Sequence, residues 1–115
     1  MEILNNYKKL NSEQIQTITK FCPPKLYQTQ TELIYEGHVP NVGYFILKGA
    51  VEVSLKRKKK SEGDASGSVI GVEELLHNNP FRYTITILPG SEVCILDRSS
   101  LHELKNGDIF QELFN

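Results

Sequence analysis

From Lys25 onward the chain alternates apolar and polar residues in short runs, and turn-forming residues separate the runs. The clearest run is 50–56, in which every second side chain from Val51 to Leu55 is apolar. Such alternation places one face of a strand against a core and the other in water. Similar runs predict strands at 25–28, 33–35, 43–49, 68–70, 83–87 and 93–96, with a charged hairpin tip at 56–67. Many short strands at this spacing are typical of a small β-sandwich or barrel.

A helix is predicted on each side of the strands. Asn11 and Gln14 have the spacing of a capping box, and apolar residues recur at helical spacing up to Cys22, after which two prolines stop the helix. A serine cap at 99 or 100 begins the second helical segment, which extends to Phe114 with a break at Asn106-Gly107. We expect the first helix to pack against the outside of a sheet.

The length and composition fit one soluble domain. The chain has 115 residues, of which 39% are hydrophobic and 23% charged, as in ordinary globular proteins. We predict a single domain over residues 1–115, with a core of strands over about 25–97, helices over about 11–22 and 99–114, and a loose helix or tail over 1–9. No apolar run is long enough for a membrane span, and the start lacks the pattern of a secretory signal, so we expect a cytoplasmic protein.

Positive charge is concentrated in one run. The run Lys56-Arg-Lys-Lys-Lys60 holds five of the 13 basic residues, so the remaining eight stand against 14 acidic residues, a balance of −6. Outside this run the surface is predicted to be acidic. A general nucleic-acid surface is therefore disfavoured.

The residue types that usually carry catalysis or bind metal are not arranged for either. Cys22 and Cys94 lie far apart among apolar neighbours, which favours buried free thiols over a disulfide or a reactive site. His38, His77 and His102 lack the close His-x-His pair of a cupin-type metal site. No nucleophile motif or carboxylate pair suggests acid–base chemistry. We predict no metal, no cofactor and no enzymatic activity, and only bound metal would revive a cupin-like enzyme.

One stretch, Gly71–Thr84, interrupts the strand pattern with helix-forming residues. Residues 73–76 can form one or two helical turns after the strand that ends at Gly71, and the turn-like segment 77–80 follows. Tyr83 then begins a new alternating strand. A short helix whose N-terminus lies between two strands offers unpaired N–H groups, which can cradle an anion. This stretch is therefore the candidate ligand site.

Segments along most of the chain resemble the cyclic nucleotide-binding domain family. The matching segments are Leu33-Ile-Tyr-Glu-Gly37, Tyr44-Phe-Ile-Leu-Lys-Gly49, Val51-Glu-Val53, Gly67-Ser-Val-Ile-Gly71, Glu74-Leu-Leu76, Pro80, Thr84 and Val93-Cys-Ile-Leu-Asp97. The resemblance covers about residues 12–105. It implies a mainly β fold, an eight-stranded jelly roll or β-roll (double-stranded β-helix) flanked by short helices, in which 71–84 is the phosphate-binding cassette.

This chain differs from the family at the two positions that hold the ligand. The resemblance implies a Glu directly after the glycine, for the ribose hydroxyl, and an Arg directly after the proline, for the cyclic phosphate. Val72 and Phe81 stand there instead, and Tyr83 replaces a small residue. If Tyr83 faces inward, so does Phe81, and Arg82 points out, because neighbouring strand residues lie on opposite faces.

Two hypotheses follow for the cassette. We favour a vestigial cassette in a stand-alone, bacterial-type regulatory or protein-interaction module, which does not bind cAMP or cGMP in the family's usual way. The alternative is a true sensor of a cyclic nucleotide or another small anion, through a shifted cassette that uses Arg82 and Glu73. The residues concerned are Gly71, Val72, Glu73, Glu74, Leu75, Phe81, Arg82, Tyr83 and Thr84.

Two groups of residues are candidates for binding a partner. They are Lys56, Arg57, Lys58, Lys59 and Lys60, and the C-terminal Phe110, Leu113 and Phe114. For the basic run we favour a solvated hairpin tip, with docking of an acidic partner as the alternative. For the C-terminal residues we favour packing on the roll, with an exposed apolar patch as the alternative. The expected partner is another regulatory protein, a second copy in a homodimer, or both, with no membrane insertion.

Overall fold

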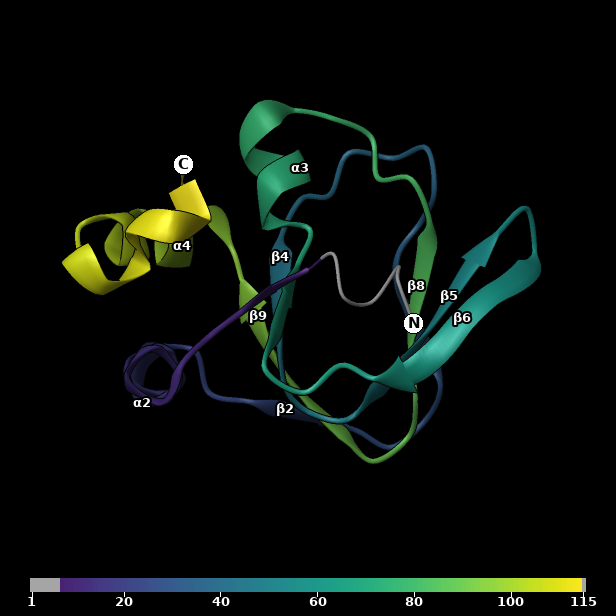
Figure 1. Ribbon diagram of the computed structural model, residues 1–115, viewed down its shortest axis with the longest axis horizontal. Helices are drawn as coiled ribbons and strands as arrows, with labels where there is room; N and C mark the ends of the chain where they lie inside the picture. Colours follow the sequence, from purple (N-terminus) through teal and green to yellow (C-terminus); the bar gives the residue numbers. More distant parts are fainter. Residues whose placement is uncertain (1–6, 115) are drawn as a thin grey trace.

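Two antiparallel sheets enclose an apolar interior in the computed structural model, which describes residues 7–114 (Figure 1). Sheet 1 has the order β1-β7-β4-β9-β2, and sheet 2 has the order β3-β8-β5-β6. The strands are β1 Lys8–Lys9, β2 Lys25–Tyr27, β3 Thr31–Ile34, β4 Gly43–Lys48, β5 Ala50–Leu55, β6 Lys58–Asp64, β7 Ser68–Ile70, β8 Thr84–Ile87 and β9 Ser91–Leu96. The mainly β prediction is confirmed, with β2 to β9 as the expected eight strands and β1 in addition.

Within residues 7–114, three α-helices and a 3₁₀ segment accompany the sheets. They are α2 Ser12–Phe21, α3 Val72–His77, α4 Arg98–Lys105 and η1 Asp108–Phe114. The predicted capping box is present: the Asn11 side chain accepts from the Gln14 backbone N–H, and the Gln14 side chain accepts from the Asn11 N–H, both at 2.9 Å. No helix within residues 7–114 has the length and apolarity to cross a bilayer.

The beginning of the described chain differs from the prediction of a loose helix or tail over 1–9. Residues 1–6 of that prediction lie outside the described part. Lys8 and Lys9 form β1, which pairs with Val69 and Ser68 of β7. The Leu10 N–H continues the contact by donating to the Gly67 carbonyl at 2.9 Å. A strand of two residues is too short to show alternation, so no apolar–polar pattern marks it in advance.

The predicted charged tip at 56–67 is wrong, because most of it is strand β6. Only Lys56 and Arg57 form the turn, with φ of 53° and 67°, the positive values that a two-residue hairpin turn requires. The Glu36 carboxylate accepts from the Lys56 N–H at 2.9 and 3.0 Å and so holds this turn. The alternation is hidden because β6 is an edge strand in which Ser61 is the one buried residue.

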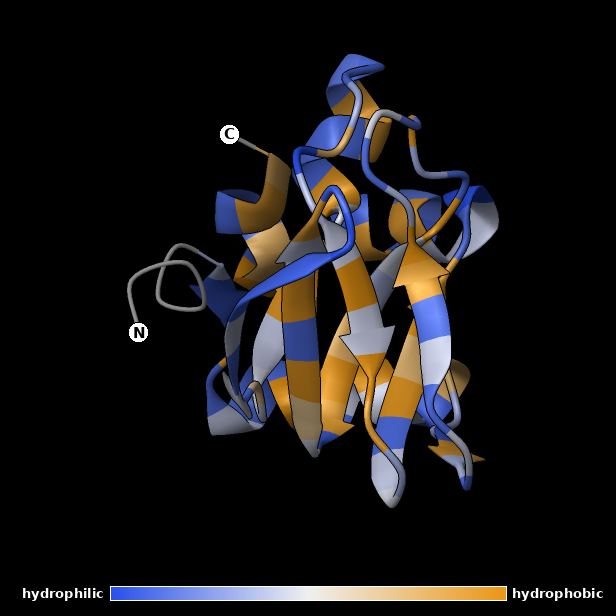
Figure 2. Ribbon diagram, turned by 90° about the vertical axis from the view of Figure 1, so that its right-hand side faces the viewer, coloured by the Kyte–Doolittle hydropathy of each residue, from blue (hydrophilic) through white to orange (hydrophobic). Residues whose placement is uncertain are grey.

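The buried apolar residues form two clusters, one on each side of sheet 1. The inner core lies between the two sheets, and the outer core lies between sheet 1 and the helices with η1. In β4, Phe45 belongs to the outer core and Ile46 to the inner core, and both have no exposed surface. A strand covered on both faces reads as a continuous apolar run. Along the strands of sheet 2, by contrast, apolar and polar residues alternate (Figure 2).

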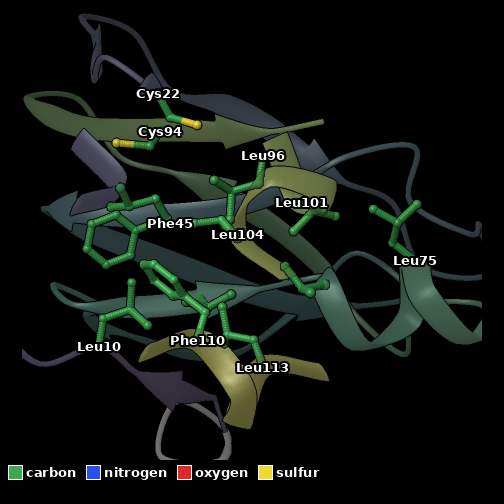
Figure 3. Packing of buried hydrophobic residues seen from close by; sticks show 13 residues of the cluster. Leu10, Cys22, Phe45, Leu75, Cys94, Leu96, Leu101, Leu104, Phe110 and Leu113 are labelled. Carbon is green, nitrogen blue, oxygen red and sulfur yellow. The ribbon is translucent and has the colours of Figure 1, made fainter. Parts of the chain in front are cut away.

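The first helix packs against the outside of sheet 1, as predicted, and the two thiols lie in the same outer core. Ile18 of α2 packs in the same cluster as Phe45, Cys22 and Cys94, and Cys22 and Cys94 are free and buried (Figure 3). The interpretation as buried free thiols is confirmed. Burial raises the pKa of the Cys94 thiol to about 11 and also raises the pKa of Cys22.

We expect both thiols to be unreactive toward a disulfide reagent at pH 8 while the chain is folded, because each is buried and protonated. In guanidinium chloride, where the chain is unfolded, both thiols should react with the reagent. Because the folded Cys94 holds its proton more tightly than the unfolded one, its contribution to stability is complete below about pH 9 and is lost as the pH rises toward 11. Rapid modification of either thiol in the folded chain at pH 8 would contradict this assignment.

Candidate functional site

The stretch 71–84 forms the predicted helix between two strands. Gly71 follows β7 and precedes α3 with φ of 88°, a left-handed conformation that glycine adopts at little cost. The Leu75 N–H donates to the Gly71 carbonyl at 3.0 Å, which closes the first turn. Asn78, with φ of 55°, ends the helix and turns the chain toward Pro80. The short helix expected between the two strands is therefore present.

Val72, at the position where the resemblance implies the ribose-binding Glu, is a packed core residue. Its side chain is only 3% exposed and belongs to the outer core together with Leu75. A Cβ added to Gly43 would lie 2.4 Å from the Val72 Cγ2, so β4 approaches this side chain closely. An apolar side chain in this contact offers no hydrogen bond to a ligand hydroxyl.

Phe81, at the position where the resemblance implies the phosphate-binding Arg, is buried in the inner core. Its side chain is 3% exposed. Two backbone bonds fix its direction: the Phe81 N–H donates to the His38 carbonyl at 2.9 Å, and the Gly37 N–H donates to the Phe81 carbonyl at 2.8 Å. The residue that should carry a positive charge into the pocket is therefore an apolar part of the core.

Arg82 lies on the opposite side of the chain from Phe81. Its side chain is exposed, and the guanidinium lies 5.3 Å from the centre of the Tyr83 ring. Tyr83 is half-buried and packs against the inner core. The directions of Phe81 and Arg82 are those predicted, but the strand begins at Thr84 rather than at Tyr83, and 82–83 form a bend.

Tyr7 joins the site from the far end of the described chain. Its ring stacks on Phe81, with the ring centres 6.2 Å apart and the planes at 21°. Burial raises the pKa of Tyr7, and the nearby Glu74 and Tyr83 raise it further, so the phenol is neutral at physiological pH. The pairing of β1 with β7 brings Tyr7 here, and the only trace in the sequence is an aromatic residue in a polar stretch.

A cavity of about 240 Å³ lies beside Tyr7 at the start of α3. Typical ligand pockets measure roughly 300–1,000 Å³. Its charged lining residues are Glu73, Glu74 and Lys8, and the Lys8 ammonium donates to the Glu112 carbonyl. Burial raises the pKa of Glu74, and the Glu73 carboxylate adds to this shift. With two carboxylates against one ammonium, the cavity disfavours an anion.

Thr84, the last cassette residue, is committed to a structural network. Its hydroxyl donates to the Glu36 carboxylate at 3.2 Å and accepts from the Glu36 N–H at 3.2 Å. The same carboxylate holds the Lys56 turn. Thr84 therefore links the end of the cassette to the β5–β6 hairpin, and Glu36 is a structural residue that the sequence did not single out.

The candidate partner residues divide into buried and exposed groups. Phe110 and Leu113 are 1% and 5% exposed and pack in the outer core (Figure 3), so they do not form an exposed patch. Phe114 is half-buried against the same cluster. The run Lys56–Lys60 is exposed throughout. Among residues 7–114, no group of three His, Cys, Asp or Glu side chains is placed to hold a metal ion.

A family model described as the cyclic nucleotide-binding domain matches residues 24–108. The chain belongs to this family. The match includes all strands from β2 onward and the whole of the stretch 71–84. No curated protein sequence matches the chain.

Solved structures of similar fold cover most of the chain. One, from a cyclic-GMP-dependent signalling pathway that regulates bacterial phytopathogenesis, has a TM-score of 0.77 at 12% identity and covers 94% of this chain and 90% of its own. A putative cyclic nucleotide-binding protein from Geobacter metallireducens has a TM-score of 0.62 at 20% identity, with 99% and 89% covered. The Thermus thermophilus catabolite activator protein has a TM-score of 0.62 at 16% identity, with 90% and 48% covered, so the chain spans about half of it. At these identities the likeness shows the fold.

Proposed function

We propose that this domain is a regulatory, protein-interaction module that does not bind cAMP or cGMP in the way usual for its family. The observation that carries the proposal is the buried Phe81, which stands at the expected phosphate-binding position and is covered by the Tyr7 ring. The two aromatic side chains take up space next to the cassette helix. A bacterial, cytoplasmic setting and the absence of enzymatic activity belong to the same proposal.

The expected loss of affinity is large. A charged, hydrogen-bonded pair that is removed from a buried site costs roughly 2–5 kcal/mol, and about 1.4 kcal/mol corresponds to a tenfold change in affinity. The missing arginine alone therefore weakens cyclic nucleotide binding by some tens to thousands of times. The carboxylates of Glu73 and Glu74 at the cavity add repulsion.

The alternative, a sensor that uses Arg82 and Glu73, has less support. Arg82 is exposed and lies against the Tyr83 ring, whereas Glu73 borders the cavity at the start of α3. For Arg82 and Glu73 to bind one phosphate together, the segment 81–83 would have to turn over. That would bring Phe81 into water and Arg82 into the core, because the two side chains point in opposite directions.

We expect no heat of binding and no thermal shift when cAMP, cGMP or a cyclic dinucleotide is added to the full chain. The matched variant Arg82→Ala should behave as the wild type and change the free energy of unfolding by no more than about 0.5 kcal/mol, because the side chain is exposed. Isothermal calorimetry and thermal melts measure both quantities. Micromolar binding that disappears in Arg82→Ala would establish the shifted-cassette sensor instead.

A further inference from the structure

Strand β6 is the outermost strand of sheet 2. Within residues 7–114 it pairs with β5 on one side, and no strand pairs with its other side. Figure 1 shows the β5–β6 hairpin reaching out from the roll. An edge of this kind presents a row of backbone N–H and C=O groups that can accept another strand.

The charges along β6 run from basic to acidic. The strand reads Lys58-Lys-Lys-Ser-Glu-Gly-Asp64, so three cations precede Ser61 and two carboxylates follow it. If two copies of this strand lie antiparallel and centred on Ser61, the basic end Lys58–Lys60 of each copy lies beside the acidic end Glu62–Asp64 of the other. This contact occurs twice by symmetry. The charge pattern is therefore its own complement in the antiparallel arrangement, whereas a parallel arrangement in register would place like charges together.

The charged side chains of this strand reach solvent. Lys58, Lys60, Glu62 and Asp64 are exposed, and the Asp64 carboxylate accepts from the Ser66 hydroxyl at 2.8 Å, while the Ser61 side chain is buried. Lys60 lies at a register shift and has no Cα partner in β5. Lys59 already pairs with Glu62 at 3.3 Å, so cations and carboxylates of this strand meet on one face. Opposite charges that face each other across antiparallel strands stabilise the pairing.

We propose that β6 pairs antiparallel with β6 of a second copy of this chain, and that sheet 2 continues across a twofold axis. The same patch on both copies forms the contact, as an isologous interface requires. This inference rests on the proposed function, because it names the partner of a module that works through protein contacts. A protein partner is favoured over a nucleic acid, because Glu62 and Asp64 on the same strand repel phosphates.

Two charge-reversal variants test the pairing. The acidic variant carries Lys58→Glu and Lys60→Glu, and the basic variant carries Glu62→Lys and Asp64→Lys. Sedimentation velocity over a range of concentrations should show a reversible wild-type dimer. Each variant alone should dimerise at least about tenfold more weakly, because strand ends of like charge now lie beside each other. An equimolar mixture should form a heterodimer, because the altered strands complement one another.

The control variant Lys20→Glu with Lys105→Glu has the same net charge as the acidic variant but changes exposed helix residues, and it should dimerise as the wild type. Thermal melts verify that every variant is folded. A wild type that stays monomeric, or a mixture that does not associate, overturns the proposal and leaves the cassette proposal intact, since calorimetry tests that separately. Binding of RNA or DNA that the acidic variant loses would also overturn it.

Discussion

Replacing Phe81 with alanine is expected to lower the free energy of unfolding by about 3–5 kcal/mol. Phe81 is 3% exposed and contributes to the inner core together with side chains from both sheets. The substitution removes the buried ring and leaves a cavity, and Tyr7 loses the surface on which it stacks. Denaturation in guanidinium chloride, followed by circular dichroism, measures the loss.

Two neighbouring substitutions calibrate this result. Arg82→Ala should change the free energy of unfolding by at most about 0.5 kcal/mol, because its side chain is exposed. Tyr7→Ala should fall between the two, since it removes a half-buried ring and an aromatic contact worth about 0.5–1.5 kcal/mol. A loss below about 1 kcal/mol for Phe81→Ala would mean that the ring is dispensable to the core.

The direction of the cassette side chains was accessible to sequence reasoning because strand geometry leaves two choices. Extending the alternation of the predicted strand back through Tyr83 gives Phe81 inward and Arg82 outward, as found, although 81–83 precede β8, which begins at Thr84. The helix at 72–77 was predictable for a similar reason, since Gly71 and Asn78 mark its two ends. Local chemistry decides these features, so a single sequence suffices for them.

Features that depend on distant contacts could not be predicted in this way. β1 is a strand only because the edge of β7 lies beside it, and Tyr7 reaches Phe81 only through that pairing. β6 has one buried residue and no visible alternation, because its stability comes from pairing with β5 rather than from its own apolar face. The Glu36 carboxylate, which bonds to Thr84 and Lys56, likewise joins segments that are remote in sequence.

The cassette backbone predicts that nucleotide binding can be partly restored by changing its side chains. In the double variant Phe81→Arg with Tyr7→Ala, a guanidinium replaces the buried ring and the stacked ring is removed. Without an anion the buried charge is unpaired, which costs about 3–5 kcal/mol, so the melting temperature should fall strongly. Cyclic AMP or cyclic GMP should raise it again, because a ligand that binds only the folded state stabilises that state.

If the backbone at 71–84 still forms an anion site, the phosphate of the ligand must cause the recovery of the melting temperature. Adenosine, which has no phosphate, should give a much smaller shift than cAMP in thermal melts at equal concentration. The variant Phe81→Met with Tyr7→Ala opens the same space without a charge and should not respond to either compound. Equal shifts with adenosine and cAMP, or a response in the methionine variant, would indicate that the ligand fills an apolar cavity. A shift that requires both the arginine and the phosphate would show that Gly71 and α3 still hold the geometry of an anion site, and that the side chains at 7 and 81 are what close it.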